Sequence, residues 1–64
     1  MDKEYNYQAN WNSEEEAWIA TVDEFPSLSW IEETKIEALQ GLIVLVDAVV
    51  VDLRKNNMYI PQPK

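Results

Sequence analysis

The sequence contains neither cysteine nor histidine, and Gly41 is its only glycine. Without cysteine, no disulfide and no thiolate metal site can hold the fold together. Without histidine, the commonest general base is missing, and the serines have no imidazole to activate them as nucleophiles. A single glycine also excludes a glycine-rich phosphate loop. These absences argue against catalysis, so we expect a protein that is not an enzyme.

Basic residues are also scarce, since five Lys or Arg stand beside twelve Asp or Glu and give a formal net charge of −7. Nucleic-acid binding needs clustered cations that contact phosphates, so we expect no direct nucleic-acid partner. Apolar residues make up 47% of the chain, which is too many for a disordered acidic segment. The composition therefore favours a folded interaction module.

Long apolar runs are missing as well. The longest, residues 41–53, is interrupted by Asp47 and Asp52 and is shorter than the about 20 residues of a membrane span. The charged N-terminus is followed by no apolar run, so we expect no signal peptide and no membrane partner. The cytoplasm is the expected location. The length of 64 residues predicts a single domain over 1–64.

Alternation of apolar and polar residues predicts strands in the first half of the chain. Residues 5–11 and residues 17–22 show this period of two, and the polar residues 12–16 between them fit a hairpin loop. Pro26 interrupts the pattern because it cannot donate to a sheet, and residues 28–31 form a short third strand.

A helix is predicted from Thr34, which begins a capping box with Glu37. Arg54 and Lys55 fall in the last turn, where cations are favoured. Along the predicted helix, apolar residues recur at spacings of three and four and form one stripe. This stripe consists of Ile36, Leu39, Ile43, Val46, Val50 and Leu53. The expected fold class is α+β, a three-stranded antiparallel sheet packed by one long helix.

A second apolar stripe follows the same helix and consists of Leu42, Leu45 and Val49. A helix on a single sheet needs only about 100° of apolar face, so something must cover the second stripe. We expect a homo-oligomer, most simply a symmetric dimer, with these residues at its interface. The alternative is that the C-terminal tail folds over this face.

Acidic residues occur in short runs, at residues 14–16, 23–24 and 32–33. Neighbouring strand residues point to opposite faces and oxygen-ligand sites gather about six ligands, so we expect no metal and no cofactor. An acidic sheet surface can instead dock onto a cationic protein. The alternative is that the charge only keeps a small domain soluble.

Several motifs appear in a fixed order along the chain. Residues 24–39 read acidic-Phe-Pro-x-Leu-Ser-Trp followed by Thr-x-x-x-Ala-Leu, and residues 60–63 read Ile-Pro-Gln-Pro. In this order and spacing, the chain from Tyr5 to Pro63 resembles the HicB family of toxin–antitoxin antitoxins. It departs from the family where Glu15, Glu16 and Ala17 replace the usual Asp-Gly turn, so we expect a looser hairpin.

The resemblance implies a partial RNase H-like fold with the element order β-β-β-α. It also allows a short last strand near Ile60. It also implies a function, because HicB proteins oligomerise and bind HicA, a small basic toxin that cleaves mRNA, and cover its active surface. Many members carry a C-terminal DNA-binding segment, which we expect to be absent from residues 1–64. An orphan oligomeric regulatory domain without a toxin is the main alternative, and a metal-dependent nuclease remnant is a third.

The acidic runs and the third strand are the expected toxin-binding surface. The predicted toxin contacts are Glu14, Glu15, Glu16, Asp23, Glu24, Trp30, Glu32 and Glu33. No catalytic residue is predicted.

Overall fold

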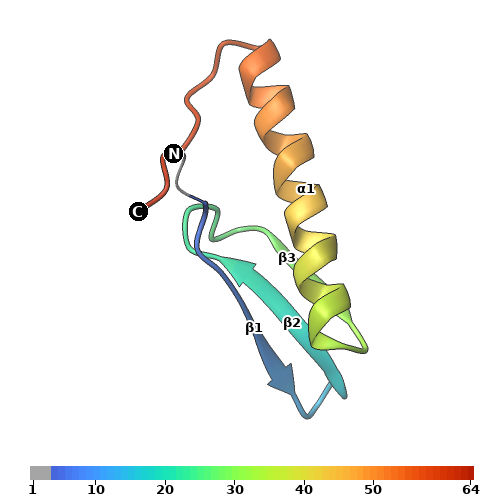
Figure 1. The fold of residues 1–64 in the computed structure, drawn as a ribbon. Coiled ribbons are helices and arrows are strands. Elements are labelled where there is room, and N and C mark those ends of the chain that lie inside the picture. The colour runs from blue at the N-terminus through green and yellow to red at the C-terminus, as the bar shows by residue number, and fades with distance from the viewer. Residues whose placement is uncertain (1–3) are drawn as a thin grey trace.

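The computed structural model describes residues 4–64, which form a three-stranded antiparallel sheet and one helix (Figure 1). The strands are β1 (Tyr7–Asn12), β2 (Ala17–Val22) and β3 (Ser29–Glu32), and the helix is α1 (Lys35–Lys55). The sheet order is β1-β2-β3, and α1 covers one face of it. This confirms the predicted α+β fold of a sheet packed by one long helix.

The strand register places Tyr7 and the three tryptophans on the face covered by α1, whereas Ile19 and Ile31 pair on the opposite face. Trp11 lies opposite Trp18, and Ala20 lies opposite both Ala9 and Trp30. The rings of Trp11 and Trp18 meet edge to face with centroids 5.9 Å apart. Such cross-strand aromatic pairs stabilise a sheet in a way similar to side-chain pairs along a helix.

The hairpin between β1 and β2 closes tightly without glycine. The side-chain oxygen of Asn12 accepts a hydrogen bond from the backbone amide of Glu15 at 3.0 Å. Glu16 takes the left-handed conformation with φ of 51°, which glycine adopts at lower cost. The strands pair through to Asn12 and Ala17, so the turn itself is confined to residues 13–16.

The core lies between the sheet and the helix. Its fully or nearly buried members come from β2, the loop after it and one line along α1. They are Ala20, Val22, Phe25, Ala38, Leu42 and Val46. Phe25 packs edge to face with Tyr5, with ring centroids 5.2 Å apart, so the Phe-Pro motif anchors the loop before β3.

Both ends of α1 are capped by side chains or by a left-handed residue. The Thr34 hydroxyl accepts from the Glu37 amide at 3.2 Å, which confirms the predicted helix start. At the other end, Asn57 has a φ of 53°, and Met58 donates its amide to the Leu53 carbonyl at 2.9 Å. Asn57 donates to the Arg54 carbonyl, which completes a Schellman motif.

The face of α1 that meets the sheet differs from the predicted one. The line of contact runs through Ala38, Leu42 and Val46, between the two apolar stripes, whereas Ile36 and Ile43 of the first stripe are exposed. Because α1 is apolar nearly all round, periodicity alone did not fix its orientation. Leu42 is fully buried against the sheet, so the prediction that it lies at an oligomer interface is wrong.

The C-terminal tail, residues 58–64, is extended and returns toward the start of the described chain (Figure 1). It pairs with no strand of the sheet, so the short last strand near Ile60 is not formed. The tail does not cover the outer side of α1. Along the described residues, no helix is long and apolar enough to cross a membrane.

Candidate protein-binding surface

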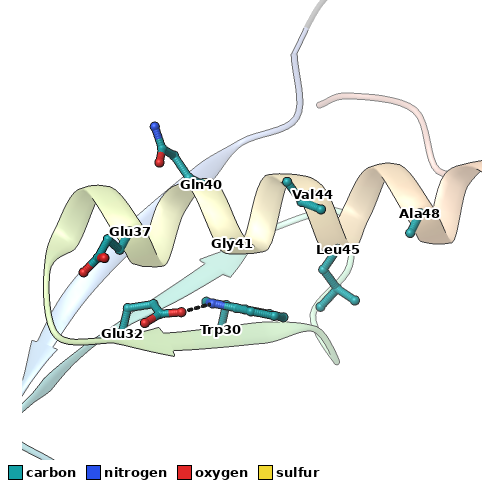
Figure 2. Close-up of a pocket in the computed structure, with 8 residues that line it drawn as sticks. All are labelled: Trp30, Glu32, Glu37, Gln40, Gly41, Val44, Leu45 and Ala48. Carbon is teal, nitrogen blue, oxygen red and sulfur yellow. Dashed lines mark hydrogen bonds between the residues drawn. The ribbon is translucent and has the colours of Figure 1, made fainter.

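An open groove runs between β3 and one flank of α1 (Figure 2). Its volume is about 550 Å³. It is lined by Trp30, Glu32, Glu37, Gln40, Gly41, Val44, Leu45 and Ala48. The floor is apolar, while carboxylates and an amide stand at one end. Concave apolar surfaces with a few polar groups at the rim are typical binding sites.

Trp30 shapes this groove because it packs directly beneath the helix. Figure 2 shows its indole between β3 and α1, and the indole nitrogen donates to the Glu32 carboxylate at 2.8 Å. A Cβ added at Gly41 would clash with the indole ring. The only glycine of the chain therefore permits the close approach of Trp30 to the helix.

β3 is an edge strand of the sheet, since it pairs with β2 alone. Alternate backbone donors and acceptors along its outer side are therefore left without a strand partner. The strand is only four residues long and is followed by Glu32 and Glu33. Short edges with nearby charge are how proteins keep such edges from pairing indiscriminately.

The predicted acidic contacts fall at two opposite ends of the sheet. Glu14, Glu15 and Glu16 occupy the turn before β2, and Glu32 pairs with Trp18 near the start of β2. Glu33 follows directly, so these five carboxylates gather at the hairpin end, whereas the loop containing Asp23 lies at the other end. We call the five carboxylates of Glu14, Glu15, Glu16, Glu32 and Glu33 the acidic end.

The Glu24 carboxylate is buried and is not part of a partner-binding surface. Its side chain is only 8% exposed, and its carboxylate accepts from the Asn6 amide, the Asn6 side chain and the Lys64 amide at 2.7–3.0 Å. Burial opposes ionisation, but these hydrogen bonds outweigh it and lower the pKa of Glu24 to about 2. The prediction that Glu24 contacts a toxin is wrong, because its oxygens are already used to hold the tail.

A second, smaller hollow of about 260 Å³ lies on the opposite flank of α1. Its lining consists of Glu4, Tyr5, Tyr7, Ile43 and Asp47. Burial, followed by the Asp47 carboxylate, raises the pKa of the Tyr7 hydroxyl. Its charged groups are the carboxylates of Glu4 and Asp47, and within residues 4–64 no third acidic side chain joins them to form an ion site.

The helix also presents apolar residues to solvent. Val44 and Val51 are exposed, whereas Leu45 and Val49 of the predicted oligomer face are half-buried against the core. An exposed apolar ridge on a small domain marks a surface that can bind another protein. The residues available for such a contact are Val44 and Val51, with Leu45 reachable through the groove.

Metal ligands do not converge anywhere in residues 4–64. No group of three or more Asp or Glu side chains lies close enough together to hold an ion. The carboxylates of the acidic end stand on a turn and a strand end, exposed or half-buried, rather than around one point.

The sequence predictions give a binding role to Leu45 alone among the helical residues of the groove. They use Glu37 only for capping and Gly41 only to exclude a phosphate loop, and they give no binding role to Gln40, Val44 and Ala48. Gly41 was the available signal, because a glycine inside a helix costs about 1 kcal/mol relative to alanine and often has a packing reason.

No family model, no curated protein and no solved structure matches this chain.

Proposed function

We propose that this chain is an antitoxin-like interaction module that binds and neutralises a small basic, mRNA-cleaving toxin of the HicA type by covering its active surface. The observation that carries the proposal is the acidic end with the partly exposed Trp30 beside it. Complementary charge speeds the encounter with a basic partner, and tryptophan is enriched among residues that dominate binding energy.

The motifs that resemble HicB each have a structural role, which supports the proposal. Phe25 anchors the loop in the core, Trp30 forms the groove and Thr34 caps the helix. The order β-β-β-α agrees with a partial RNase H-like fold, which is part of the proposal together with a cytoplasmic location. No nuclease activity is proposed, because no carboxylate cluster forms in residues 4–64.

Co-expression with a small basic protein from a neighbouring gene tests the proposal. We expect the wild-type chain to restore growth to cells that make the toxin and to co-elute with it on size exclusion. A double variant, Glu32→Lys with Glu33→Lys, should lose both effects, because it reverses two charges at the acidic end. Asp47→Lys with Asp52→Lys changes the net charge equally on the helix and should retain both. If the two double variants behave alike, only the net charge of the chain affects toxin binding, and the acidic end has no specific role.

An orphan oligomeric regulatory domain without a toxin is the second candidate, and the exposed ridge of Val44 and Val51 favours it. In this candidate, a symmetric dimer would bury the ridge of Val44 and Val51 against a second copy, in place of the predicted interface of Leu42, Leu45 and Val49. This second candidate requires a dimer of the wild type in sedimentation and a smaller mass for Val51→Asp. A monomeric wild type would contradict the proposed homo-oligomer. A gene neighbourhood without any short reading frame for a basic protein would favour the orphan role.

A further inference from the structure

The outer edge of β3 and the groove lie next to each other, so one occupant can use both. A strand added to β3 would lie about 4.8 Å away, and its alternate side chains would face α1 as those of β3 do. Trp30 and Glu32 are two residues apart and therefore share that face. An added strand would place side chains beside both of them, in the groove beneath the helix flank (Figure 2).

The lining of the groove sets which side chains fit. Trp30, Val44, Leu45 and Ala48 provide an apolar floor, and Glu32 and Glu37 stand at one end. None of the lining residues is basic. Lys35, at the start of α1, has its ammonium 5.7 Å from the ring centroid of Trp18 and is not among the lining residues.

Charge decides between a second copy of this chain and a different protein as the occupant. Two copies paired through β3 would each bring Glu32 and Glu37 to one interface where the groove lining offers no basic residue, and the net charge of −7 on each copy adds repulsion. A segment with lysine or arginine would instead pair with these carboxylates. The charge of the groove therefore favours a basic protein segment.

We propose that an extended segment of a basic protein adds to β3 as a fourth strand. On the face toward α1, it places an apolar side chain against Trp30 and Val44, and two residues away a Lys or Arg beside Glu32 and Glu37. Main-chain hydrogen bonds supply affinity, and the alternate side chains supply specificity. The inference rests on the proposed function, to which it adds the site and the conformation of the bound segment.

Three synthetic peptides test the inference on the full chain. The first, Val-Thr-Lys-Thr-Val-Thr-Lys, alternates as the groove requires. The second replaces each Lys by Gln, and the third replaces each Thr by Pro, which removes backbone donors but keeps the charge. We expect the first peptide to bind at least tenfold more tightly than either of the others, and to slow amide exchange in residues 29–32 and not in β1. Equal binding of the first and third peptides would overturn strand addition.

A matched pair of variants locates the site. Val44 and Ile36 are both 69% exposed on α1, but only Val44 lines the groove. We expect Val44→Lys to weaken binding of the first peptide at least tenfold, because it replaces part of the apolar floor by a cation that also repels the lysines of the peptide, and Ile36→Lys to leave binding unchanged. Thermal melts confirm that both variants are folded. Equal affinities for the two folded variants would overturn the inference.

The same variants separate the inference from the proposed function. If wild-type protein and Val44→Lys bind the neighbouring basic toxin equally, the toxin binds elsewhere and only the groove assignment fails. If the wild type binds the first peptide as expected but no toxin, the antitoxin function fails and the groove assignment stands. If Val44→Lys instead converts a wild-type dimer to a monomer, a second copy occupies the groove and the inference is wrong.

Discussion

At the scale of single residues, Glu24 ties three distant parts of the chain together. Its carboxylate joins the segment before β1, the loop after β2 and the last residue of the tail. Tyr5 adds a second tie, since its hydroxyl donates to the Pro61 carbonyl at 2.6 Å. No local pattern in the sequence distinguishes Glu24 from the other carboxylates, because its partner Lys64 lies 40 residues away.

The lowered pKa of Glu24 predicts an acid dependence of stability. The carboxyl has a pKa of about 2 when folded and about 4.5 as its ordinary value. Ionised Glu24 therefore stabilises the fold above about pH 4.5, and this contribution is lost as the pH falls toward 2. We expect the melting temperature of the wild type to fall over this range and that of Glu24→Gln to fall less. Parallel curves for the two proteins would show that Glu24 carries no such linkage.

The close contact at Gly41 gives a second prediction at the scale of single residues. Gly41→Ala should push the Trp30 indole outward, since the added Cβ clashes with it. The change in stability is the difference between about 1 kcal/mol gained in helix propensity and about 1–3 kcal/mol lost to overpacking, so it lies between no change and about 2 kcal/mol of destabilisation. We expect red-shifted tryptophan emission from a folded protein. The same substitution in a Trp30→Phe background is the control, and a shift that persists there would exclude Trp30 as its source.

At the scale of elements, the helix ends were predictable and the helix orientation was not. The capping box at Thr34 and the asparagines after Lys55 are local signals with a direct physical meaning. The orientation depends on which stripe packs best against the sheet. Ala38 lets the backbone of α1 approach the sheet closely, and this favours a line that neither apolar stripe predicted.

The C-terminal end of α1 gives a testable prediction at the scale of elements. Asn57→Ala should destabilise the protein by about 1 kcal/mol, because alanine tolerates the left-handed conformation poorly. Asn57→Gly should be neutral or slightly stabilising. Chemical denaturation of both variants checks the expectation. Equal stability of the alanine and glycine variants would mean that the Schellman motif contributes nothing measurable.

At the scale of the whole molecule, the acidic charge and the motif order were visible in the sequence, but the groove was not. Trp30, Gly41 and Val44 meet only after the helix folds back over β3. The sequence therefore supports a proposal for the kind of partner, and the fold brings together the surface on which that proposal can be tested.

The net charge of −7 makes association with a basic partner sensitive to salt. The screening length shortens from about 10 Å at 0.1 M to about 3 Å at 1 M ionic strength. We expect the association rate with a basic toxin to fall by about tenfold or more across this range, while the dissociation rate changes less. Stopped-flow tryptophan fluorescence measures both rates. An association rate that is independent of salt would contradict electrostatic steering.

The strand order β1-β2-β3 has a kinetic consequence. Each strand pairs with its immediate neighbour along the chain, so the sheet closes through short loops, a topology associated with fast folding. The contact between Glu24 and Lys64 closes a far larger loop, and we expect it to form late. Refolding would then build the sheet and helix first and fasten the tail in a later step.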